Sequence, residues 1–136
     1  MSTTPAPLPA AHAPATFTPV PSFITQLATS PYPAWTTSAV LLGAVPLCVK
    51  APRGFPHLIQ LPLFAAVFGG TGYMIKEDPL NGAGTTTAWS LIYLFFNARR
   101  ALTPSVRTGL RKPVPVGLAA WMAGQAGVYG WWYFAQ

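Results

Sequence analysis

Few residues in this 136-residue chain could carry out chemistry. The chain has one cysteine, Cys48, two histidines, His12 and His57, and two acids, the adjacent Glu77 and Asp78. Cys48 lies in an apolar stretch and has no acid nearby to orient a histidine, so no nucleophile and base pair is indicated. One thiol, two distant imidazoles and two adjacent carboxylates also make no metal-ligand set. We therefore predict no catalytic residue, no metal site and no cofactor, and we expect that the protein is not an enzyme.

The composition predicts lipid, rather than water, as the solvent of most of the chain. Charged residues make up 7% and hydrophobic residues 51%, whereas a soluble domain carries about 25% charged residues. Residues 54–75, 79–98 and 113–136 contain no charged side chain. Because about 20 helical residues cross the roughly 30 Å hydrocarbon core of a bilayer, each run is long enough to span a membrane.

The predicted fold is an all-α membrane protein with four transmembrane helices arranged as two hairpins. We expect the spans at about 33–49, 57–75, 82–97 and 114–134, within a four-helix transmembrane domain of residues 32–136. Pro46 should kink or end the first span early. Residues 1–31 lack charge and are rich in Pro, Ala and Thr, so we predict a disordered tail there.

Small residues at four-residue spacing predict how the helices pack, because they let helix backbones approach closely in lipid. The predicted helix-packing and interface residues are Ala65, Ala66, Gly69, Gly70, Tyr73, Gly82, Thr86, Ser90, Ala119, Ala123, Gly124 and Gly127. Gln60 and Gln125 are the strongly polar residues inside the spans. Our first interpretation is that they form hydrogen bonds between helices, and the alternative is contact with a substrate.

The charged turn between the second and third spans contains Lys76, Glu77, Asp78 and Asn81. We interpret it as a solvated hairpin in which Asp78 or Asn81 caps the next helix. The alternative is a docking site for a partner. The Gly-rich run that follows lacks the lysine of a phosphate-binding loop, so we identify no small-molecule substrate.

Basic residues collect in the two loops on the opposite side. Their distribution predicts that these loops face the inside of the compartment and that both termini face the other side. The basic residues near the third and fourth spans, with a role in topology or in contact with lipid headgroups, are Arg99, Arg100, Arg107, Arg111 and Lys112. Because the net charge of +6 comes from these membrane-edge positions, we do not expect nucleic-acid binding.

Three segments carry a family resemblance: YPAWTTSAVLL at 32–42, GYMIKEDPLNGAGTTTAWSLIYL at 72–94 and VYGWWYF at 128–134. With these segments the chain resembles the fungal altered inheritance of mitochondria protein 19 family. The resemblance implies a mitochondrial location, membrane integration and involvement in mitochondrial inheritance or maintenance, and it implies no enzyme activity. Together with the charge distribution, it predicts an inner-membrane protein with both termini in the intermembrane space.

The expected function is that of a non-catalytic structural or assembly component, whose partners are membrane lipids and other inner-membrane proteins. One alternative is an accessory subunit of an inner-membrane respiratory complex, such as complex I. A second alternative is a small transporter, which requires Gln60 or Gln125 to line a wet cavity.

Overall fold

The computed structural model describes residues 21–50, 55–107 and 113–136, with the helical backbone alone for 104–107. These residues form five α-helices and no β-strand. The helices are α1 (Ser22–Ala28), α2 (Tyr32–Lys50), α3 (Gln60–Glu77), α4 (Pro79–Arg107) and α5 (Pro113–Phe134). The all-α class predicted from the sequence is confirmed for the described part of the chain.

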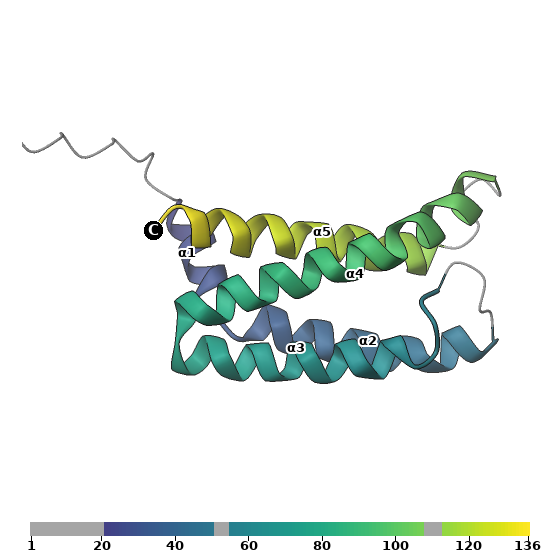
Figure 1. The fold of residues 1–136 in the computed structure, drawn as a ribbon, viewed down its shortest axis with the longest axis horizontal. Helices are drawn as coiled ribbons and strands as arrows, with labels where there is room; N and C mark the ends of the chain where they lie inside the picture. Colours follow the sequence, from purple (N-terminus) through teal and green to yellow (C-terminus); the bar gives the residue numbers. More distant parts are fainter. Residues whose placement is uncertain (1–20, 51–54, 108–112) are drawn as a thin grey trace, which may run out of the picture.

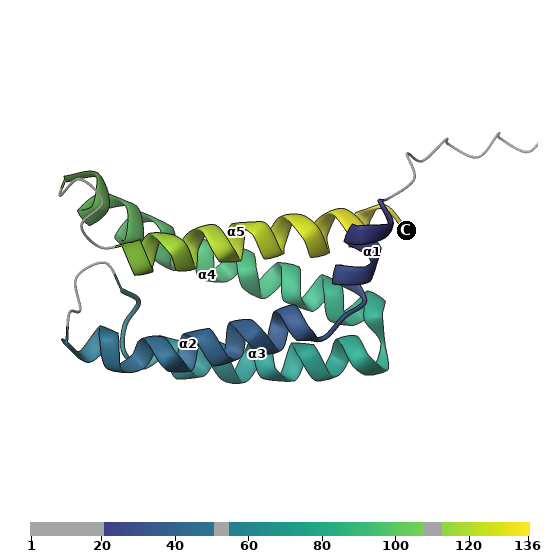
Figure 2. The same ribbon diagram turned by 180° about the vertical axis from the view of Figure 1, so that it is seen from behind.

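The four long helices run side by side along one axis in two pairs, α2 with α3 and α4 with α5 (Figures 1 and 2). The closest backbone approaches are between α2 and α3, α3 and α4, and α4 and α5, whereas α2 and α5 approach each other less closely. Short α1 packs on α5. Helix α1 and the C-terminus therefore lie at the same end of the bundle (Figure 1).

A single residue, Asp78, separates α3 from α4. Its backbone is extended, its Oδ1 accepts a hydrogen bond from the Asn81 amide at 3.2 Å, and its carbonyl accepts one from the Gly82 amide at 2.9 Å. Pro79 follows as the first residue of α4, where its missing N–H costs nothing. Asp78 is thus the cap that the sequence predicted, and the two helices meet in a tight hairpin.

Aromatic side chains fill the centre of the bundle. Phe64 of α3 meets the rings of Tyr93 and Trp89 of α4 edge-on, with ring centroids 5.2 and 6.1 Å apart. A second apolar cluster near the α3–α4 turn contains Ile75 and Tyr129. Edge-to-face geometry is the preferred arrangement of such rings, so these contacts join α3 firmly to α4.

Polar side chains of α2 donate hydrogen bonds to backbone carbonyls of α3. The Ser38 hydroxyl donates to the Ala65 carbonyl at 2.7 Å, and the Trp35 indole donates to the Gly69 carbonyl at 3.3 Å. The indole of Trp35 lies directly over Gly72, where an added Cβ would collide with the ring. These bonds form because the small residues of α3 leave its carbonyls within reach.

Two helix boundaries and the tail differ from the predictions. Helix α1 lies inside the segment predicted to be disordered, while residues 1–20 of that segment fall outside the described residues. Helix α2 continues past Pro46 to Lys50, so it does not end early. Helix α4 continues beyond Asn97 to Arg107. Residues 98–102 are the good helix formers Ala, Arg and Leu, and the helix also includes Pro104.

Membrane-spanning capacity can be judged from helix length, mean hydropathy and charge. By this measure α2, and no other helix within the described residues, is long and apolar enough to cross a bilayer. One helix rather than the predicted four meets the test.

Candidate functional site

Three side chains of α5 reach across to the start of α2. Trp121, Gln125 and Tyr129 are spaced four residues apart and therefore share one helix face. The Trp121 indole donates to the Thr37 hydroxyl at 2.8 Å, and the Gln125 amide donates to the Pro33 carbonyl at 3.0 Å. The Tyr129 hydroxyl donates to the carbonyl of Ser30, just before α2, at 3.2 Å. We call this contact the α2–α5 seam, and it replaces close backbone packing between the two helices.

The acceptors of the seam are themselves connected. The Thr37 hydroxyl accepts from Trp121 and donates to the Pro33 carbonyl at 2.8 Å. That carbonyl therefore accepts from both Thr37 and Gln125. Thr37 is buried, so its hydroxyl is shielded from water and the loss of a partner there is costly.

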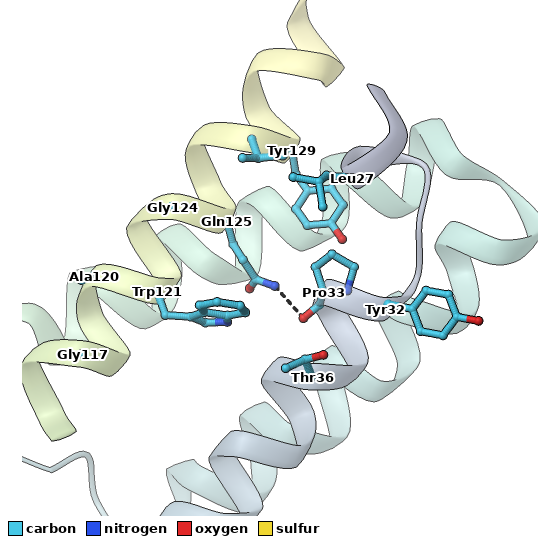
Figure 3. A pocket seen from close by; sticks show the side chains of 11 residues that line it. Leu27, Tyr32, Pro33, Thr36, Gly117, Ala120, Trp121, Gly124, Gln125 and Tyr129 are labelled. Atoms are coloured by element: carbon cyan, nitrogen blue, oxygen red, sulfur yellow. Dashed lines mark hydrogen bonds between the residues drawn. The ribbon is translucent and has the colours of Figure 1, made fainter. Parts of the chain in front are cut away.

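A pocket of about 640 Å³ lies along the seam, between α1, α2 and α5 (Figure 3). Leu27 of α1 and Tyr32, Pro33 and Thr36 of α2 form part of its wall. Helix α5 contributes the rest of the wall, with Gly117, Ala120, Trp121, Gly124, Gln125, Val128 and Tyr129. Among the described residues, no charged side chain lines this pocket. The volume and the apolar walls are those of a small-molecule site.

Gln125 has one satisfied and one unsatisfied end. The residue is 6% exposed, and its Oε1 is buried with no hydrogen-bond partner. Figure 3 shows the amide reaching from α5 towards α2, with its nitrogen bonded to Pro33. A buried acceptor without a donor costs about 1–3 kcal/mol, so this oxygen is the polar atom of the site that a ligand could satisfy.

The two glutamines behave differently from each other. The prediction that Gln125 bonds between helices is confirmed. The same prediction is wrong for Gln60, whose Oε1 accepts from the nearby His57 amide at 3.3 Å. Of the two, Gln125 also lines the pocket on the seam.

A second pocket, of about 450 Å³, lies at the end of the bundle that carries the arginines of α4. It brings together Cys48, His57 and Arg100, three residues that the sequence separates. The Cys48 thiol donates to the Pro56 carbonyl at 3.5 Å. Both acids of the chain, Glu77 and Asp78, belong to the α3–α4 turn, so no carboxylate is available here to orient His57. Among the described residues, no three His, Cys, Asp or Glu side chains gather as a metal site.

The small residues predicted to pack helices on α3 divide into two groups. Ala65 is buried against α2, and the Gly69 carbonyl receives the Trp35 indole. Ala66, Gly70 and Tyr73 are exposed in the part of the chain that the structure describes. The interface predicted at these three residues stays a prediction.

The predicted stripe on α4 is buried along its length. Gly82, Thr86 and Ser90 all face the interior, and an added Cβ at Gly82 would lie 2.6 Å from the Ile75 Cα. The Thr86 hydroxyl donates to the Gly82 carbonyl at 2.8 Å. Helix α4 can approach α3 this closely because Gly82 has no side chain.

The predicted stripe on α5 faces mainly outward. Ala119 is buried, whereas Ala123, Gly124 and Gly127 are exposed. Nothing lies within 4 Å of a Cβ added at Gly124 or Gly127. Gly124 faces the pocket instead of a helix.

The charged residues occupy the two ends of the bundle. Lys76, Glu77, Asp78 and Asn81 are exposed in the α3–α4 turn. Arg99 and Arg100 are exposed towards the other end of α4. The side chain of Arg107 and all of Arg111 and Lys112 lie outside the described residues.

Sequence reasoning missed Trp121, Tyr129 and Thr37. The available signal was the four-residue spacing of hydrogen-bond donors at 121, 125 and 129, which the small residues between them obscured. Gly72 was also not singled out, because only the position of Trp35 makes it necessary.

Comparison with known proteins identifies a family. Residues 27–134 match the family described as altered inheritance of mitochondria protein 19. The chain is similar to the altered inheritance of mitochondria protein 19 homolog of Schizosaccharomyces pombe, with 32% identity over 82 residues. The aligned part covers 60% of this chain and 69% of that protein. No solved structure matches the chain.

Proposed function

Because the chain belongs to the altered inheritance of mitochondria protein 19 family, we propose that it is a non-catalytic, multi-pass protein of the mitochondrial inner membrane. In this proposal it supports mitochondrial inheritance or maintenance as a structural or assembly component. Family membership connects the chain with mitochondria, and the proposal adds the membrane, its topology and the role.

Large apolar side chains that point outward from the long helices carry the proposal. Leu42 on α2 is 53% exposed, Leu63 on α3 58% and Phe95 on α4 83%. Exposing side chains of this size to water forfeits about 25 cal/mol per Å² of apolar surface, and soluble monomers rarely expose large apolar patches. A surrounding of lipid removes this cost.

Helices α4 and α5 fall short in mean hydropathy because they are rich in Gly, Thr, Tyr and Trp. Helix α3 falls short mainly because it includes Gln60, Lys76 and Glu77. An average over residue types counts each hydroxyl as if it were unsatisfied. In α4, however, the hydroxyls of Thr85, Thr86 and Thr87 donate to carbonyls four residues earlier, at 2.8–2.9 Å. Such internal bonds lower the cost of placing hydroxyls in lipid, which supports membrane integration of the whole bundle.

The charges at the bundle ends support one topology. Lys50, Arg99 and Arg100 belong to the end opposite the α3–α4 turn (Figure 1). Under the positive-inside rule this end faces the matrix. Both termini and the turn with Glu77 and Asp78 then face the intermembrane space.

Topology can be tested with two single-cysteine variants in a Cys48→Ala background. Lys76→Cys and Arg99→Cys are a matched pair, because both replace an exposed cation at a helix position. We expect a membrane-impermeant maleimide to label position 76 once the outer membrane is ruptured, and position 99 only after the inner membrane is opened. Equal labelling of both, or release of the protein by alkaline carbonate, would contradict the proposal.

The structural role predicts that the protein resides in a larger assembly. The exposed residues Ala123 and Gly127 of α5 support this, because small outward residues suit contact with a further membrane helix. Blue-native electrophoresis after mild solubilisation should show a species larger than the monomer. Migration only as a free monomer would contradict the role, and co-migration with one respiratory complex at fixed stoichiometry would assign the protein to that complex instead.

A further inference from the structure

The pocket on the α2–α5 seam has three properties that together define a ligand: neutral walls, one partly flat wall and one buried acceptor without a donor. From these we infer that the pocket binds a neutral lipid of the sterol class, with the sterol hydroxyl donating to Gln125 Oε1. The inference goes beyond the proposed structural role, because binding requires neither a partner protein nor a particular topology.

The walls of the pocket disfavour a charged ligand. No charged side chain lines the pocket among the described residues, and the lining surface is almost entirely carbon. Transferring an ion into such a site without a counter-charge is strongly unfavourable. The ligand must therefore be neutral, which excludes phospholipids whose headgroup would have to enter the pocket.

Part of the α5 wall of the pocket is flat. Gly117, Ala120 and Gly124 are spaced three and four residues apart, so they lie on one helix face and present nothing larger than a methyl group. A Cβ added at Gly117 or Gly124 would have no neighbour within 4 Å. A rigid fused-ring body can lie against this flat part of the wall, and it loses less conformational entropy on binding than a flexible acyl chain.

Gln125 supplies the polar contact. Its Nε2 is fixed on the Pro33 carbonyl, while Oε1 has no partner. The last torsion of a glutamine side chain is soft, so the amide can turn and present Oε1 to the pocket. This rotation gives up the bond from Nε2 to the Pro33 carbonyl, which keeps its bond from Thr37. One hydroxyl then satisfies the oxygen, and the sterol class combines a single hydroxyl with an otherwise apolar body. The volume of about 640 Å³ lies within the usual range for small-molecule sites.

The test uses the purified full-length chain in detergent and tritiated cholesterol as the probe. We expect saturable binding, with unlabelled cholesterol competing at least tenfold better than its 3-methyl ether, which keeps the shape and removes the donor. Tenfold corresponds to about 1.4 kcal/mol, the scale of one hydrogen bond. No saturable binding to the folded protein, or better competition by oleyl alcohol than by cholesterol, would overturn the inference.

Two matched variants locate the binding. Ala120→Leu fills the pocket, whereas Ala123→Leu adds the same group on the same helix outside it. We expect at least a tenfold loss of cholesterol binding in the first and no change in the second. Unchanged binding by Ala120→Leu would overturn the site, and Gly117→Leu tests the same wall should Ala120→Leu fail to fold.

Gln125→Leu tests the hydrogen bond itself. This variant should bind cholesterol and the methyl ether with equal affinity, because it has no side-chain oxygen at position 125 to accept a hydrogen bond from the cholesterol hydroxyl. A preference for cholesterol that persists in this variant would overturn the role of Gln125. Because these assays are done in detergent, their failure would leave the carbonate and labelling tests of the proposed membrane protein unaffected.

Discussion

The α3–α4 hairpin and the α2–α5 seam show two opposite ways of joining helices. In the hairpin, Gly82 removes the side chain that would separate two backbones, and α4 lies directly on Ile75. In the seam, the long side chains of Trp121, Gln125 and Tyr129 bridge a wider separation and leave a pocket beside them. A contact made where a glycine lacks a side chain is rigid and leaves no free space. A contact made through long side chains leaves space between the helices that a ligand can use.

The largest expected effect comes from Gly82→Ala. The new Cβ would lie 2.6 Å from the Ile75 Cα, and backbone cannot move aside as a side chain can. We expect a loss of about 3 kcal/mol in the free energy of unfolding, measured by SDS titration of the protein in mixed micelles. Gly70→Ala is the control, because nothing lies within 4 Å of its Cβ, and an equal loss there would remove the contrast.

Gly72→Ala should have a smaller effect. Here the added Cβ collides with the indole of Trp35, a side chain that can turn away at the cost of its bond to the Gly69 carbonyl. We expect a loss of about 2 kcal/mol in the same titration. Gly69→Ala should be close to neutral, since its Cβ would make an ordinary 3.5 Å contact with Ser38.

Trp121→Phe tests one bridge of the seam. It removes the indole donor to Thr37 but keeps a ring against the pocket, so we expect a loss of about 1 kcal/mol. Trp131→Phe is the matched control, because Trp131 is 58% exposed on the same helix and forms no part of the seam. Equal losses in the two variants would show that the hydrogen bond contributes nothing of its own.

Gln125→Leu should change stability least. The substitution removes the bond to Pro33, but it also removes a buried oxygen that has no partner, and Pro33 keeps its bond from Thr37. These two effects offset, so we expect a change within about 0.5 kcal/mol. A loss as large as that of Gly82→Ala would mean that the seam is as rigid as the hairpin.

Much of the fold could be predicted from the sequence because its signals are local. Long charge-free runs defined three of the four long helices, α3, α4 and α5, and Asp78 followed by Pro79 defined the turn between α3 and α4. Helix α1 could not be predicted, because seven residues do not form a stable helix alone and its contact with α5 is tertiary. The end of α4 was also missed, since arginines at a membrane edge do not stop a helix.

The site was less predictable, because the sequence pattern of small residues is the same on a helix face that packs against another helix and on a face that borders a pocket. Gly82 and Gly124 were both predicted to pack helices, yet Gly82 lies on Ile75 and Gly124 on the pocket. What distinguishes them is the distance of the facing helix, which no local pattern encodes. Gln125 was recognised because a strongly polar residue in an apolar helix must find a partner.

All three donors of the seam belong to the last helix of the chain, and all three acceptors belong to residues 30–37. During synthesis these acceptors are therefore made first, and they have no α5 donors until α5 has been completed. The α5 helix of a second copy offers the same donors at the same spacing. Two chains that meet before closure can consequently exchange their last helices and satisfy the same bonds, giving a swapped dimer whose amount increases with expression level.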